Sequence, residues 1–234
     1  MKNTDDLVDR LVAVEADNAR LRRLLDEVGL NDSLRHAFRD TVALLRAVLR
    51  RSAGTAEGVE GYVAHFEGRL DAITRVRART DAFGEADLHT LIADALLVYL
   101  VREGERATLD GPDVRLRPKA AQVLALAVHE LASNAIEHGA SGDGSGRVDV
   151  SWRVEAGAAE PTLALMWKES GGAGLSEPSR RGFGTAVLED MLAYDLGGRT
   201  VLSYEPDGLR CDIRLPLIGR VGRLAADEGA VPEL

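Results

Sequence analysis

The chain has 234 residues, a formal net charge of −9 and a single cysteine, Cys211. This length suits one ordinary domain with an appendage or two small domains, and 29% charged residues with a mean hydropathy of −0.10 exclude collagen-like, mucin-like and wholly disordered chains. The lone cysteine excludes an intramolecular disulfide and a cysteine-based zinc site. Because the sequence has neither an apolar run of about 20 residues nor a signal-peptide core, we expect a cytoplasmic protein without a membrane partner.

Acidic residues are unevenly distributed along the chain. Residues 81–234 carry 25 of the 38 acidic side chains, whereas residues 1–80 are close to neutral. Neither part is strongly basic, so we expect no nucleic-acid partner.

Residues 1–30 carry a heptad pattern, in which the spacing of one seam alternates between four and three residues. A seam of about three heptads predicts a two-stranded coiled coil, and therefore a homodimer. Asn18 falls at an a position, which favours a parallel dimer in fixed register. A single amphipathic helix folded onto its own domain is the alternative. The seam consists of Leu7, Leu11, Val14, Asn18, Leu21, Leu25 and Val28.

Residues 31–80 predict a helical hairpin. Two amphipathic stretches, at about 34–51 and 59–76, are separated by a short loop around residues 52–55. Each helix must bury its apolar stripe, so two hairpins in a dimer would form a four-helix bundle.

His36 lies on the polar face of the first hairpin helix. An exposed helical histidine usually has no function, but this one is surrounded by positive charge that would attract a phosphate group or an acidic partner. The surrounding residues are Arg35, Arg39, Arg46, Arg50 and Arg51.

Residues 81–217 predict an α+β sandwich with one helical layer on a mainly antiparallel sheet. Turn signals end the apolar segments, and residues 218–234 are expected to be a poorly ordered tail. The predicted helices are 88–101, 118–138 and 185–195, and the predicted strands are 107–109, 114–116, 146–154, 162–168, 199–204 and 209–215.

Three motifs in this part carry residues suited to nucleotide chemistry. Glu130 and Asn134 lie one turn apart on the helix of 118–138, and a carboxylate with an amide oxygen suits Mg²⁺. Residues 167–172 place Glu169 before glycines at a strand end, and residues 181–185 lead through glycines into a helix whose free N–H groups could hold phosphate.

Together these motifs resemble the HWE subgroup of bacterial two-component sensor histidine kinases. That subgroup is named for a histidine in the asparagine box and a Trp-x-Glu in the first glycine box, which here are His129, Trp167 and Glu169. The resemblance extends from about residue 34 to 216. It implies a Bergerat (GHKL) ATP-binding fold for 81–217, and for 31–80 a dimerisation and histidine phosphotransfer hairpin with His36 as phosphoacceptor.

The resemblance also implies ligands and partners. ATP with Mg²⁺ is the expected ligand, with Asn134 and Glu130 on the metal and Glu130 also assisting deprotonation of His36. The phosphoryl group would pass to a response-regulator receiver domain. Because no space is left for a sensor domain after the coil, the signal would arrive through the coiled coil, through a partner such as a separate sensor protein, or not at all. The expected nucleotide-binding residues are His129, Asn134, Trp167, Glu169, Gly171, Gly172, Gly182, Phe183, Gly184 and Thr185.

The chain departs from the family pattern in the histidine motif, in the asparagine box and at Ala173, where a proline is common. Ser33 and Asp40 flank His36 where Glu and Asn are usual, and Glu137-His138 replaces a Lys-Tyr pair in the asparagine box. A degenerate kinase or histidine phosphotransferase that docks receivers is therefore the first alternative. A kinase of the same fold that phosphorylates Ser or Thr on a protein antagonist is the second.

Overall fold

The computed structural model describes residues 20, 32–52, 58–80, 84–137, 146–157, 160–171 and 182–225. The chain divides into two compact units, Met1–Ala47 and Val48–Leu234. In the first unit the structure describes Arg20 and the start of helix α2 (Asp32–Ser52), which contains His36. The predicted helix of 34–51 is confirmed, whereas the predicted coiled coil of 1–30 lies outside the described residues apart from Arg20.

The second unit is built on a five-stranded sheet with the order β2-β4-β5-β7-β6. The first pair, β2 and β4, is parallel and the other pairs are antiparallel, so the predicted mainly antiparallel sheet is confirmed. The strands are β2 (Ala107–Asp110), β4 (Arg147–Glu155), β5 (Thr162–Ser170), β6 (Arg199–Glu205) and β7 (Gly208–Pro216).

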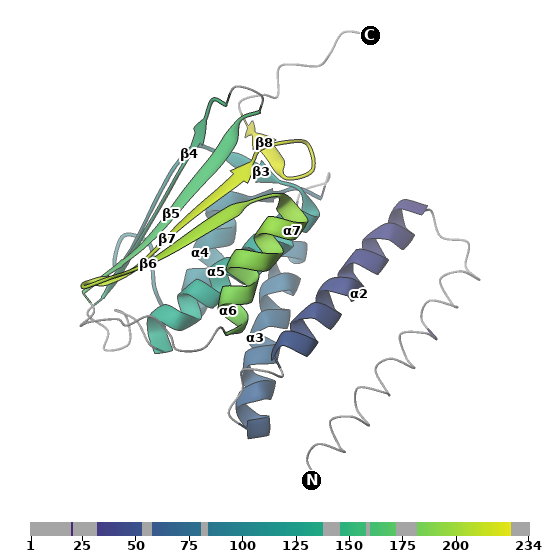
Figure 1. Cartoon of the computed structure of the whole chain (residues 1–234), viewed down its shortest axis with the longest axis horizontal. Coiled ribbons are helices and arrows are strands. Elements are labelled where there is room, and N and C mark those ends of the chain that lie inside the picture. The colour runs from purple at the N-terminus through teal and green to yellow at the C-terminus, as the bar shows by residue number, and fades with distance from the viewer. Residues whose placement is uncertain are drawn as a thin grey trace. The chain divides into compact units, whose positions relative to one another are not determined.

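The helices of this unit gather on one side of the sheet, as predicted (Figure 1). The central helix is α5, of which 15 of 20 residues are buried. Such burial follows from its composition, because a helix that is apolar all round must be covered on all sides. The helices are α4 (Leu88–Val98), α5 (Pro118–Glu137), α6 (Phe183–Thr185), the π-helical turn η1 (Ala186–Met191) and α7 (Leu192–Leu196).

Helix α3 (Gly58–Ala78) also belongs to the second unit. It packs on α5 through a buried face that contains Ala72, Ile73, Val76 and one charged residue, Arg69. The predicted second hairpin helix of 59–76 is thus present, and its buried stripe lies against α5.

A small second sheet has the order β1-β3-β8, with β1 (Ala86–Asp87), β3 (Val114–Leu116) and β8 (Gly222–Leu224). Glu85, which is 3% exposed, joins its parts through ion pairs to Arg117 at 3.1 Å and Arg223 at 3.2 Å. Residues 218–225 were expected to be part of a tail, but here they include a paired strand. A three-residue strand is too short to show a period-two pattern, so the sequence did not reveal it.

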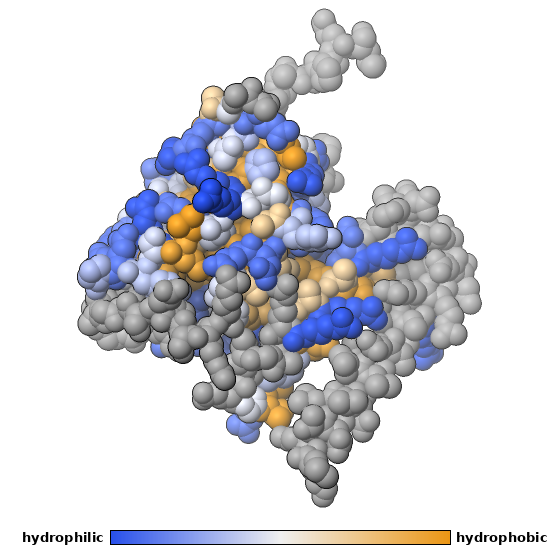
Figure 2. Space-filling view, in the orientation of Figure 1, coloured by the Kyte–Doolittle hydropathy of each residue, from blue (hydrophilic) through white to orange (hydrophobic). Residues whose placement is uncertain are grey.

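The described surface is mainly hydrophilic on the face seen in Figure 2, with hydrophobic areas interrupted by polar side chains. None of the helices in the described ranges combines the length and apolar character needed to cross a bilayer.

Because β8 completes the small sheet, we expect a chain ending at Leu217 to be less stable than one ending at Ala225. The shorter chain loses the fully buried Val221 and leaves the buried carboxylate of Glu85 without Arg223. The free energy of unfolding should fall by about 3 kcal/mol, measured by urea denaturation of both chains. Equal midpoints and slopes would contradict a structural role for β8.

Candidate functional site

Two of the three predicted motifs meet at the junction of α5 and α6. Gly184 lies so close to α5 that a Cβ atom placed on it would be 3.3 Å from both Nδ2 of Asn134 and Oε2 of Glu130. A side chain at position 184 would therefore fill the space beside these two polar groups. The structure confirms that Glu130, Asn134 and Gly184 come together.

The segment after Gly184 is helical, as predicted, but its geometry is unusual. Gly182 precedes α6 with an extended backbone, and α6 continues into the π-helical turn η1 before α7 begins. Single π-helical turns are rare and frequently occur at functional sites. Phe183 is 2% exposed and Thr185 is half-buried, so Phe183 faces the interior of the unit.

Glu130 is engaged by a residue that sequence reasoning missed. Nε of Arg69 on α3 lies 2.8 Å from Oε1 of Glu130, and Nη2 lies 3.0 Å from Oε2. Both side chains are almost fully buried. The Arg69 guanidinium also stacks on the ring of Phe183, 3.8 Å from its centroid. Arg69 belongs to no recognisable sequence motif. Its contact with Glu130 becomes apparent only from the packing of α3 on α5.

His129 is a buried neutral imidazole next to this ion pair. Its Nδ1 lies 3.2 Å from the Tyr99 hydroxyl, and a Cβ on Gly68 would lie 3.1 Å from its Cε1. Burial, together with the positive charges of Arg69, Arg75 and His65, lowers the pKa of His129 from 6.5 to about 4. His129 therefore lies in the contact between α3 and α5 and supports it as an uncharged ring.

Trp167 and Glu169 lie on the same side of β5, two residues apart. Trp167 is fully buried, and its indole Nε1 donates a hydrogen bond of 3.2 Å to Oε1 of Glu169, which is 1% exposed. The strand ends at Ser170 and is followed by Gly171, whose φ of +93° is accessible to glycine without strain. The indole therefore orients the carboxylate, while the neighbouring expected residue Gly172 lies outside the described residues.

Glu137 has a local partner on its own helix. The Ser133 hydroxyl donates a hydrogen bond of 2.6 Å to Oε1 of Glu137. This position therefore supplies a carboxylate held by α5 rather than a free cation, and His138 lies outside the described residues.

His36 belongs to the first unit, and its side chain is outside the described part of α2. Its predicted role as phosphoacceptor stays a prediction. Arg39 and Asp40, on the same helix, are exposed.

Asn134 and Glu130 suit the binding of a divalent cation that takes few ligands from the protein. In the described part of the chain no three His, Cys, Asp or Glu side chains cluster as a metal site. Mg²⁺ commonly uses one or two protein oxygens and completes its shell with water and substrate phosphates, and Asn134 with Glu130 could supply such oxygens. Glu130 would have to exchange Arg69 for the metal.

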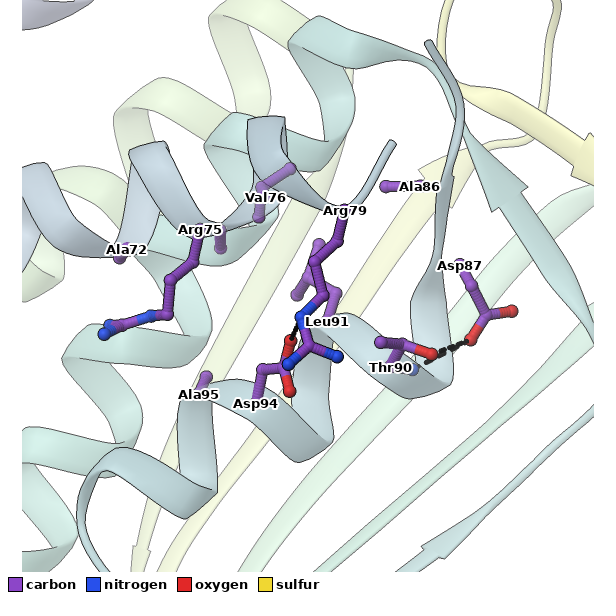
Figure 3. Close-up of a pocket in the computed structure, with 11 residues that line it drawn as sticks. Ala72, Arg75, Val76, Arg79, Ala86, Asp87, Thr90, Leu91, Asp94 and Ala95 are labelled. Atoms are coloured by element: carbon purple, nitrogen blue, oxygen red, sulfur yellow. Dashed lines mark hydrogen bonds and ion pairs between the residues drawn. The ribbon is translucent and has the colours of Figure 1, made fainter. Parts of the chain in front are cut away.

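A pocket lies away from these motifs, between α3, α4 and β1 (Figure 3). Beside it Arg79 forms an ion pair of 2.8 Å with Asp94, and the Asp87 carboxylate accepts a hydrogen bond of 2.8 Å from the backbone N–H of Thr90. None of the predicted site residues lines it.

Comparisons with known proteins agree with the motif assignment. The family model for HWE histidine kinase matches residues 33–113. A blue-light-activated histidine kinase of Rhizobium johnstonii is 31% identical over 208 residues, covering 88% of this chain and 56% of the relative. A blue-light-activated histidine kinase of Brucella anthropi is 27% identical over 219 residues, covering 92% of this chain and 42% of the relative.

The fold is similar to that of solved histidine kinases. The blue-light-activated histidine kinase EL346 of Erythrobacter litoralis superposes with a TM-score of 0.54 at 18% identity, covering 75% of this chain and 59% of that chain. Its histidine kinase domain alone gives a TM-score of 0.50 at 18% identity, covering 74% and 93%. The chain spans about half the length of the curated relatives that it matches.

Because burial holds His129 neutral, we expect it to make folding sensitive to acid. Between pH 6.5 and pH 4 the unfolded chain binds a proton at this residue and the folded chain does not, so stability present above pH 6.5 is lost as the pH falls towards 4. The contribution is up to about 3 kcal/mol. The free energy of unfolding, measured by denaturation between pH 4 and pH 6.5, should depend less steeply on pH for His129→Gln than for the parent chain. His89→Gln is the control, because His89 is only half-buried. Equal slopes in all three proteins would contradict the burial argument.

The buried ion pair predicts strong coupling between Arg69 and Glu130. Arg69→Gln or Glu130→Gln alone should cost roughly 3–5 kcal/mol, because each leaves a buried charge without its partner. The double variant should cost less than the sum, with a coupling energy of ~1–3 kcal/mol in a denaturation cycle. The exposed pair of Arg102 and Glu105, 4.0 Å apart, should show coupling below about 0.5 kcal/mol. Additive effects at positions 69 and 130 would show that the pair does not act as a unit.

Proposed function

This chain belongs to the HWE histidine kinase family, and we propose that it transfers the γ-phosphoryl group of ATP to His36 and from there to a response regulator. The observation that carries this proposal is the meeting of Glu130 and Asn134 with the glycine at position 184. A carboxylate, an amide and an approachable backbone at one point suit a metal-bound phosphate chain.

In this proposal each motif has one task in nucleotide binding. Glu169, oriented by the Trp167 indole, accepts a hydrogen bond from the adenine amino group. The residues from Gly182 to Thr185 hold phosphate with backbone N–H groups. Asn134 and Glu130 hold Mg²⁺, which supplies charge neutralisation to the phosphates when it is bound.

The proposed reaction is an in-line phosphoryl transfer. An imidazole nitrogen of His36 forms a bond to the γ-phosphorus while the bond between that phosphorus and the β,γ-bridging oxygen breaks, and ADP leaves. Glu130 accepts the proton that the imidazole gives up. Positioning and electrostatics provide most of the rate enhancement in such reactions.

The proposed acceptor of phosphohistidine is an aspartate of a receiver domain. Positive charge along α2, including the exposed Arg39, would attract an acidic receiver and stabilise phosphate on His36. We further propose a homodimer assembled through residues 1–30 and the hairpin, with the signal arriving through the coiled coil or from a separate sensor protein.

We expect His36→Ala to abolish labelling by γ-³²P-ATP and Mg²⁺, reducing it to below about 1% of the parent chain. The label on the parent chain should be lost in acid and retained in base, as for a phosphorus–nitrogen bond. His65→Ala is the matched control, because His65 is an exposed histidine on α3. Equal labelling of the His36→Ala and parent proteins, or an acid-stable label, would overturn the assignment of His36.

A histidine phosphotransferase without efficient ATP turnover is the second candidate function. It is favoured by one observation, the carboxylate of Glu137 that Ser133 holds on α5. The family resemblance leads us to expect the lysine of a Lys-Tyr pair at this position. Incubation with a phosphorylated receiver separates the two functions. Phosphate uptake by His36 together with nucleotide affinity weaker than millimolar would select the phosphotransferase.

A further inference from the structure

Arg69 occupies the carboxylate to which the proposed reaction assigns proton transfer and metal binding. Its guanidinium engages both oxygens of Glu130, at 2.8 and 3.0 Å. A bidentate guanidinium–carboxylate pair is among the strongest charge-assisted contacts, and burial shields this one from water and salt. While the pair is formed, the guanidinium neutralises the Glu130 carboxylate and occupies its chelating side, which weakens the binding of another cation there.

The same guanidinium also covers the start of the phosphate-binding segment. It lies 3.8 Å from the centroid of Phe183, one residue before the Gly184 that contacts Glu130 and Asn134. Arg69 therefore joins α3 to α5 and to α6 at once.

A second contact fixes α3 on α5 at the neighbouring residue. Gly68 approaches the His129 ring so closely that a Cβ would lie 3.1 Å from Cε1 and 3.2 Å from Nε2. The buried Ala72, Ile73 and Val76 continue the same face for two further turns. The position of Arg69 therefore depends on how the whole of α3 packs on α5.

We propose that Arg69 is a latch: when α3 is seated on α5, it withdraws Glu130 from the reaction, and Mg²⁺-nucleotide loading requires its release. This inference rests on the proposed function, because it assigns regulation to that site. The guanidinium and the metal compete for one carboxylate, because each neutralises its charge and the guanidinium already takes the side that a chelated metal would need. A movement of α3 away from α5 would free Glu130, and the hairpin helix would thereby control the site.

Two variants on α3 test the latch without altering a proposed nucleotide ligand. Arg69→Gln removes the ion pair and the stacking on Phe183. Gly68→Ala adds a methyl group 3.1 Å from Cε1 of His129, so the ring or α3 must shift by a few tenths of an ångström. It also gives the helix a better helix former. Arg77→Gln is the matched control, because it removes one positive charge from an exposed position of the same helix.

Hydrogen–deuterium exchange of the full chain without nucleotide provides a readout that does not depend on kinase activity. We expect the amides of α3 to exchange at least tenfold faster in Arg69→Gln and in Gly68→Ala, and by a larger factor than the amides of β4, β5 and β7 in the same variants. In Arg77→Gln, the exchange of α3 should stay unchanged. In the parent chain, saturating Mg²⁺-ATP should produce the same acceleration in α3. Unchanged α3 exchange in both latch variants would overturn the proposal.

Measurements of nucleotide affinity and of labelling show whether the release of Arg69 strengthens or weakens the binding of Mg²⁺-ATP. The latch predicts that both α3 variants bind Mg²⁺-ATP three- to thirtyfold more tightly than the parent and label faster on His36. Weaker binding in Arg69→Gln would overturn the latch and assign Arg69 to the nucleotide site as a phosphate-binding cation. If the parent chain binds no nucleotide, the proposed function fails, whereas faster exchange of α3 in the two variants would still show that Arg69 and Gly68 seat this helix.

Discussion

The arrangement around the candidate site depends on the buried ion pair between Arg69 and Glu130. Two opposite charges removed from water stabilise a fold only when each completes the other's hydrogen bonds, and a partner lost on either side leaves a costly buried charge. The pair therefore constrains how α3 lies on α5, how Phe183 is covered and which groups can approach Glu130. The neighbouring His129 follows the same logic, because a buried imidazole beside an arginine is most stable without a charge.

The carboxylate of Glu169 is held by a hydrogen bond from an indole and not by an ion pair. Glu169 sits in the interior of the sheet, where the Trp167 indole donates to it and where Gly208 of the adjacent strand passes very close to its backbone. The two halves of the Trp-x-Glu motif thus act as one unit, since the indole both fills the core and sets the direction of the carboxylate. A large residue that made no hydrogen bond would satisfy the first requirement and not the second.

Much of the second unit could be predicted from the sequence because its elements have clear periods and turn signals. The helix that carries Glu130 and Asn134 was expected at 118–138 and runs from Pro118 to Glu137. The convergence of Asn134 with Gly184 was also predictable, since glycines and paired polar residues in a fixed order mark a site. What could not be predicted depends on contacts between distant segments. Arg69 reads in sequence as one more charged residue beside an apolar stripe, and β8 is too short to carry a pattern.

The π-helical turn between Gly184 and Leu192 constrains the length of the chain at this point. A π turn holds one residue more than an α turn, so the segment of 186–191 carries an extra residue between the glycine that faces Asn134 and the start of α7. If the same residues formed an α turn in place of the π turn, everything after them would rotate by about 100° relative to Gly184. Leu192 and Leu196, both buried now, would then turn away from the core. The π turn therefore accommodates one more residue here while Gly184 stays beside Asn134 and the two leucines stay in the core.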